Sequence, residues 1–261
     1  MRGTLETIQN RLRSEPGTEI RRWATIGGVG ILLIAALSIF ANFLVLERLV
    51  TSGDATRTAT DIASSKGLFQ AGIFGWVLIA VLDVLVAVAL FGVLSPVNRR
   101  VAMIAAWARV LYGAVLGIAI LRLVGALAAA NGQATSGSSR DVLRNVEGFT
   151  DIWNVGLILF GIHLFLAGYL AFRSGYISKL VGALVALAGF GYLFDAAVRA
   201  LVDDAASLSV ITGLGEFVFG VWLVIRGRRI ALAPAAPASA VPGIPHRQQR
   251  KEQPRESHRS R

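Results

Sequence analysis

Cysteine is absent from the 261-residue chain, and histidine occurs only three times. The missing cysteine excludes disulfides, iron–sulfur clusters, thiol catalysis and cysteine-ligated zinc. His246 and His258 lie in a basic tail, which leaves His163 as the one histidine within the apolar part of the sequence. HExxH, G-x-S-x-G and glycine-rich phosphate-loop motifs are missing as well. The sequence therefore predicts no metal site, no cofactor and no catalytic residue.

Charge is also scarce, at 16% of residues, whereas hydrophobic residues make up 54%. A soluble domain usually carries about a quarter charged residues. The stretch from Trp23 to Leu46 contains no charge and is long enough to cross a bilayer, which takes roughly 20 residues. We predict an all-α, polytopic membrane bundle of six transmembrane helices, over residues 23–46, 69–94, 101–129, 150–172, 177–200 and 207–226.

The positive charges predict the orientation of the bundle. Of 26 Lys and Arg residues, 18 lie on the side of the two termini, six on the opposite side and two within spans. Because Lys and Arg gather on the cytoplasmic side, both termini are predicted to be cytoplasmic. Abundant arginine and alanine suggest a bacterial source, and hence the bacterial cytoplasmic membrane.

The net charge of +10 lies mostly in the termini and short loops, without a nucleic-acid-binding motif, so we expect no nucleic-acid partner. Residues 1–22 form a polar cytoplasmic segment, 23–229 the transmembrane domain and 230–261 a basic tail rich in Ala and Pro. The tail composition is typical of disorder. Besides the lipid bilayer as a whole, anionic lipid headgroups are the partner that this tail would attract. No oligomeric state is predicted.

Two predicted outer loops differ in character. Residues 130–148 are rich in Gly, Ser, Asn and Gln, which is typical of a polar loop. In the first loop, Asp54 could cap a short amphipathic helix with Ala59 and Ile62 on its apolar face. The alternative is a solvated linker.

Four of the spans each carry one ionisable residue near the same depth: Asp83, Arg109, His163 and Glu216. Counted along the helices, all four lie roughly 12–17 Å from the inner edge of the bilayer core, close to its midplane. Ionisable groups at that depth cost at least a few kcal/mol each, so they usually face a partner or a watery cavity. We expect the four side chains to form one buried polar layer.

The layer has three interpretations. It could be an ion-pair network that fixes the packing of the helices. It could be a proton-linked or ligand-binding centre, which is a common role of ionisable groups in membranes. Intramembrane catalysis is the third, and it would need a nucleophile or metal beside His163.

A second group of polar residues is expected near the outer leaflet: Asn42, Arg122, Asp151, Asn154 and Asp195. Arg122 could pair with Asp195 or Asp151 across helices. The group is either a set of outer-end salt bridges with snorkelling side chains or a vestibule leading to the midplane layer.

The chain also resembles the domain-of-unknown-function 4386 family of multi-pass membrane proteins. The resemblance covers about residues 24–229 and is carried by the loop from Gly53 to Gly72, the Asp83 span with its LSPVNR end, the HLxxxGYLxxxSGY stretch and GEFVFGVWLVIRG. It implies that His163 and Glu216 belong to a shared architecture, without assigning them a role. The leading hypothesis is a non-enzymatic membrane protein that moves or senses a small solute or a proton. The alternatives are an intramembrane enzyme and a structural or accessory subunit of a membrane complex.

Overall fold

The computed structural model describes residues 16–132, 138–199, 201 and 214–230, and this part of the chain is helical throughout apart from its turns and connecting segments. Five of its helices are long and apolar enough to cross a membrane. The first, Thr18–Leu49, comprises α2 (Pro16–Ser38), a π-helical segment η1 (Ile39–Leu46) and α3 (Glu47–Leu49). The others are α5 (Lys66–Leu94), α6 (Arg99–Ala130), α7 (Ser139–Arg173) and α8 (Lys179–Arg199). The predicted polytopic helical bundle is confirmed.

The last predicted span is described only over its second part. A span over 207–226 was expected, but the described helix α10 is Leu214–Ile225, twelve residues long, followed by the 3₁₀ turn η2 (Gly227–Arg229). A straight crossing needs roughly 20 residues, so α10 by itself covers about half of the bilayer core. Residues 207–213 lie outside the described part of the chain. The described bundle therefore contains five spanning helices and one shorter apolar helix.

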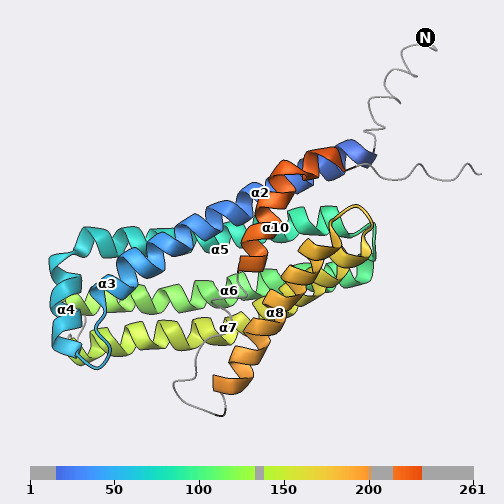
Figure 1. The fold of residues 1–261 in the computed structure, drawn as a ribbon. Coiled ribbons are helices and arrows are strands. Elements are labelled where there is room, and N and C mark those ends of the chain that lie inside the picture. Colours follow the sequence, from blue (N-terminus) through green and yellow to red (C-terminus); the bar gives the residue numbers. More distant parts are fainter. Residues whose placement is uncertain (1–15, 133–137, 200, 202–213, 231–261) are drawn as a thin grey trace, which may run out of the picture.

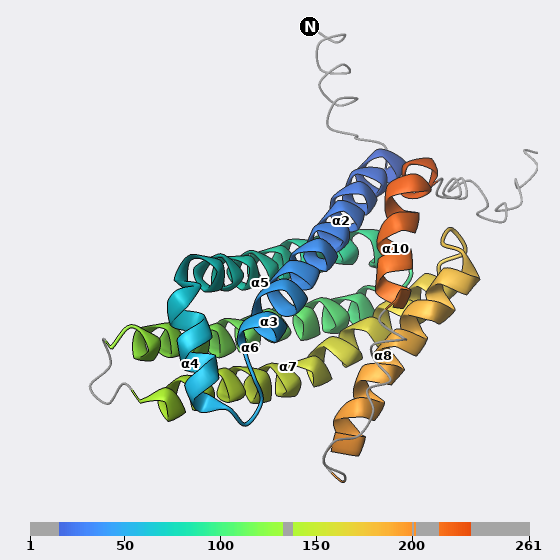
Figure 2. The ribbon, with the colours of Figure 1, turned by 60° about the vertical axis from the view of Figure 1, so that its left-hand side comes forward.

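Figure 1 and Figure 2 show α5, α6 and α7 lying side by side, with α2 crossing over α5 and α4 (Ala55–Ser64) placed across one end. At the opposite end, Tyr176 in the α7–α8 connection donates a hydrogen bond to the carbonyl of Val93 (2.6 Å). There too, Arg21 Nε donates to the carbonyl of Ile230 (2.9 Å), which joins the start of α2 to the end of the described chain. We call this the inner end, because the charge distribution predicts it to be cytoplasmic, and the α4 end the outer end.

The α4 helix agrees with the amphipathic interpretation of the first outer loop. Asp54 accepts a hydrogen bond from the backbone N–H of Arg57 and so caps the helix. Ile62 and Thr58 are fully buried. The Thr58 hydroxyl exchanges two hydrogen bonds with the backbone of Thr51, which holds the helix against the loop that precedes it. The linker alternative is therefore wrong.

The prediction of a polar loop over residues 130–148 is wrong in its second half. α7 begins at Ser139, because Ser138 and Asp141 form a reciprocal capping box. Val142, Val146 and Phe149 then follow at helical spacing and are buried. Polar composition concealed this helix start, since the capping residues are themselves typical of loops.

α7 and α8 approach each other closely through glycines. A Cβ atom added to Gly168 would lie 2.2 Å from the backbone nitrogen of Ala186, and one added to Gly182 would lie 2.4 Å from that of Phe172. A Cβ atom added to Gly189 would lie 2.3 Å from the backbone nitrogen of Phe165. Glycines at a helix interface let two backbones approach closely, which favours packing in lipid. Here they hold His163 of α7 and Tyr192 of α8 in a fixed relation.

The N-terminal and C-terminal predictions are only partly covered. Pro16 begins α2, a first-turn position that proline tolerates well, so the first described helix starts within the predicted polar N-terminal segment. The predicted disorder and lipid attraction of the tail concern residues outside the described part of the chain.

Candidate functional site

Arg109 of α6 lies at the centre of the buried polar layer, and its side chain is fully buried. Its Nε donates a hydrogen bond to Asp83 Oδ1 of α5 (2.9 Å), and its Nη1 donates to Glu216 Oε1 of α10 (2.7 Å). Arg109 Nη2 also lies 2.8 Å from Asp83 Oδ1. One guanidinium therefore joins carboxylates from two other helices.

His163 of α7 completes the layer. Its Nε2 lies 3.2 Å from Arg109 Nη1, and its Nδ1 lies 2.8 Å from the carbonyl oxygen of Ala105. A guanidinium can only donate and a carbonyl can only accept, so these partners assign the hydrogen to Nδ1 and leave Nε2 as the acceptor. His163 is thus a neutral imidazole that orients Arg109.

Phe160, one turn before His163 on α7, lies beneath the guanidinium. Arg109 Cζ is 5.2 Å from the centre of its ring, within the range of a cation–π contact. With His163 neutral, two carboxylates face one guanidinium. The layer therefore has one acidic group more than it has cations, and a net charge of −1 when both acids are ionised.

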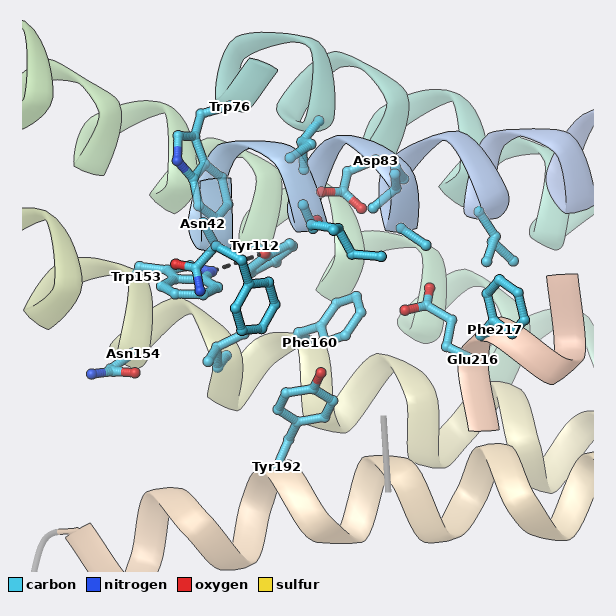
Figure 3. Close-up of a pocket in the computed structure, with 18 of the residues that line it drawn as sticks. Asn42, Trp76, Asp83, Tyr112, Trp153, Asn154, Phe160, Tyr192, Glu216 and Phe217 are labelled. Carbon is cyan, nitrogen blue, oxygen red and sulfur yellow. Dashed lines mark hydrogen bonds between the residues drawn. The ribbon is translucent and has the colours of Figure 1, made fainter. Parts of the chain in front are cut away.

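A cavity of about 470 Å³ lies beside this layer (Figure 3). Asp83 and Glu216 lie toward one end of it, and the amides of Asn42 and Asn154 toward the other. Aromatic residues from four helices also line it, and we call them the aromatic wall: Trp76, Tyr112, Trp153, Phe160 and Tyr192. Its volume is within the usual range for small-molecule sites, roughly 300–1,000 Å³.

Three residues that line the cavity carry buried polar atoms without a hydrogen-bond partner: Asp83 Oδ2, Trp76 Nε1 and Arg199 Nη2. Buried polar atoms in proteins are nearly always paired, so each exception calls for an explanation. Asp83 is 1% exposed, and Glu216, at 15%, is the more accessible acid of the layer. Unpaired atoms of both donor and acceptor type around one cavity fit a site for a polar occupant.

The π-helical segment η1 shapes one wall of the cavity. Ile39, Asn42 and Phe43 of this segment, with Ser38 just before it, are among the lining residues. A π turn closes over one residue more than an α turn and is often found at functional sites. In η1 it places an amide, Asn42, in an otherwise apolar helix wall.

The predicted outer-leaflet group is divided by the structure. Asn42 and Asn154 line the cavity, and Asn42 Nδ2 also donates to Glu47 Oε1 (3.1 Å). Asp195 is buried on α8, whereas Asp151 is exposed on α7. Arg122 packs over Gly148, and within the described part of the chain it forms no ion pair with Asp151.

The aromatic residues of the cavity were not predicted from the sequence, although their spacing from the ionisable residues was a usable signal. Tyr112 follows Arg109 by three residues, Phe160 precedes His163 by three, and Trp76 precedes Asp83 by seven. Such spacings place side chains on the same helix face as the ionisable residue. Among the described residues, no group of three or more His, Cys, Asp or Glu side chains is arranged to hold a metal ion.

The fold and the site together define a polytopic helical membrane protein with an ion-paired centre. The chain belongs to the family described as Domain of unknown function (DUF4386), whose model matches residues 26–227. A protein of Archaeoglobus fulgidus, described as uncharacterized, is 34% identical over 165 residues, which cover 63% of this chain and 89% of that relative. No solved structure matches the chain. Because this relative is archaeal, the similarity does not support the bacterial source suggested by the composition.

Proposed function

We propose that the protein binds a small solute in the cavity beside Arg109 and moves or senses it in the cytoplasmic membrane, with both termini cytoplasmic. The observation that carries the proposal is a cavity of about 470 Å³ lined by a buried carboxylate, Asp83, with one unpaired oxygen. Ionisable residues at membrane depth commonly mark solute or ion sites, and this one adjoins space for a ligand.

A purely structural role for the layer predicts a dry network in which every buried polar atom is paired. Asp83 and Arg109 meet that description only in part, because Asp83 Oδ2 has no partner and the residue lines the cavity. Trp76 and Arg199 add two more unpaired atoms around the same space. These three atoms support ligand binding over scaffolding.

Intramembrane catalysis has less support. His163, the base that such an enzyme would need, uses both ring nitrogens to contact Ala105 and Arg109. Neither nitrogen is available to take a proton from a nucleophile. The arrangement instead fits a histidine that positions the guanidinium.

Filling the cavity tests the proposal. Ala35 of α2 lines the cavity, and Ala35→Phe would place a ring within it. Ala114 of α6 is exposed and is not a lining residue, so Ala114→Phe adds the same ring on the outside of the bundle. Native mass spectrometry of protein extracted in nanodiscs should find a small species bound to the wild type and to Ala114→Phe but lost from Ala35→Phe.

Two results would contradict the proposal. One is a bound species that Ala35→Phe retains as well as the wild type does. The other is a wild type without any bound species, together with full complementation of a deletion strain by Ala35→Phe. The second result would favour a scaffold or an accessory subunit.

A further inference from the structure

We infer that the solute is a monovalent organic cation, an ammonium group on an apolar body, which binds with its charge at Asp83 and Glu216 and its body against the aromatic wall. This inference rests on the proposed function and names the chemical class of its ligand. It starts from the charges that line the cavity.

With Asp83 and Glu216 both ionised, the inner part of the cavity carries one more negative charge than positive charges. Among the described residues, Arg109 is the one cation paired with the carboxylates of Asp83 and Glu216, and the hydrogen-bond partners of His163 make His163 neutral. Arg199 lines the cavity too, four residues after the buried acid Asp195 on α8, a helical spacing at which opposite charges attract each other. An excess charge in a low-dielectric site is costly, so one added cation is favoured there and an added anion is not.

Asp83 Oδ2 supplies a specific point of attachment. It is buried, has no hydrogen-bond partner and belongs to a residue that lines the cavity. A carboxylate oxygen can only accept, so its partner must be a donor such as an ammonium N–H or the polarised C–H groups around a quaternary nitrogen. The Tyr192 ring extends from α8 with its hydroxyl toward Phe160, across the cavity from Asp83 (Figure 3).

The aromatic residues favour a cation over a neutral apolar solute. Tyr112, Trp153, Phe160 and Tyr192 come from three helices and surround the same space. Aromatic faces attract cations, and groups of such rings bind ammonium ligands. Phe160 already performs this role for Arg109, whose Cζ lies 5.2 Å from the ring centre.

An ammonium group can arrive on a free solute or on a lipid headgroup. The lining residues Ile39 and Phe43 are more than half exposed on the lipid side of the bundle, so both sources are sterically open in the described part of the chain. Nanodiscs of phosphatidylglycerol with and without phosphatidylethanolamine separate them. If phosphatidylethanolamine raises the Kd of the cationic probe named below, the lipid headgroup competes for the site. If the Kd does not change, the natural ligand is a free solute.

The test uses three probes of similar size and different charge: benzyltrimethylammonium, benzyl alcohol and phenylacetate. Calorimetric titration of the full-length protein in phosphatidylglycerol nanodiscs should show binding of the cation only. Asp83→Asn should weaken that binding by roughly tenfold to a hundredfold, the loss expected for one charged contact. Tyr192→Leu, which removes an aromatic face, should weaken it by roughly twofold to thirtyfold.

Asp61→Asn is the matched control, because Asp61 is an acid on α4 that pairs with exposed Arg57 and does not line the cavity. It should leave the Kd unchanged. If Asp83→Asn does not fold, the Kd of the cation is compared between wild type, Glu216→Gln and Tyr192→Leu instead. Glu216 is the more accessible carboxylate of the layer.

Binding of benzyl alcohol or phenylacetate as tightly as the cation would overturn the inference. If Ala35→Phe abolished that binding, the proposed solute site would be supported and only the inference that the solute is a cation would be wrong. A cation that binds equally to wild type, Asp83→Asn and Tyr192→Leu would also overturn it. If no probe binds and no native species is found, both the inference and the proposed function are wrong.

Discussion

Replacing Arg109 should destabilise the protein more than any other single change in the polar layer. The guanidinium is fully buried and is the cation that faces both Asp83 and Glu216. Arg109→Met keeps much of the side-chain volume and removes the charge, so the two acids lose their counter-ion without a large cavity being created.

Breaking a buried ion pair from one side typically costs about 3–5 kcal/mol. Arg109 serves two carboxylates and also donates to His163, so we expect a loss at the upper end of that range. Whole domains are usually stable by only about 5–15 kcal/mol. Arg109→Met should therefore remove a third or more of the free energy of unfolding.

The measurement is reversible unfolding in mixed micelles with increasing denaturing detergent, followed by tryptophan fluorescence. Trp76 and Trp153, whose rings are 5.1 Å apart beside the cavity, report on that region. Two further variants show whether the loss of stability comes from the unpaired carboxylates. Glu216→Gln should cost much less, because Glu216 is partly exposed and the guanidinium keeps Asp83.

The second comparison is the triple change Arg109→Met, Asp83→Asn and Glu216→Gln. It removes the unpaired acids together with their counter-ion, so it should recover most of the stability lost in Arg109→Met. A free energy of unfolding for Arg109→Met within about 1 kcal/mol of the wild type would refute the network as described, and so would a triple variant no more stable than the single one.

Three further outcomes are expected. Gly168→Ala should lower the yield and the melting temperature strongly, because its Cβ meets the α8 backbone, whereas Gly117→Ala, with no atom within 4 Å of its added Cβ, should be near neutral; similar melting temperatures would contradict the α7–α8 contact. Reporters active in the cytoplasm should work after Arg100 and fail when inserted at residues 133–137, and the reverse pattern would invert the predicted orientation. Ile230 is buried and its carbonyl accepts a hydrogen bond from Arg21, so truncation after Ile230 should leave the melting temperature unchanged. The melting temperature can be measured by size-exclusion chromatography of heated samples, and a large drop would show that the tail packs on the bundle.

The level of the four ionisable residues could be predicted because helix geometry turns sequence distance into depth. Asp83, Arg109, His163 and Glu216 indeed meet in the structure. Which residue pairs with which could not be predicted, because it depends on how each helix is rotated about its axis and which helices are neighbours. The same limit hid the cavity, since it is formed by side chains of six helices that the sequence does not order in space.

The errors at helix ends have local causes. The start of α7 was missed because Ser138 and Asp141 are loop-forming residues by composition and cap residues by geometry. For the sixth predicted span the structure describes only Leu214–Ile225, so its full length stays a prediction. The π-helical segment in the first span carries no composition signal at all, and so it could be seen only in the structure.

The glycine contact between α7 and α8 affects how relatives of this chain should be compared. Gly168 lies in the HLxxxGYLxxxSGY stretch that carries the family resemblance, and Gly182 and Gly189 lie just after it. A relative that keeps these glycines keeps a backbone-to-backbone contact, whatever side chains surround its cavity. Similarity over this stretch therefore reports shared geometry. Under the proposed function, the residues at positions 83, 109 and 216 are the ones that would sort relatives by the ligand each can hold.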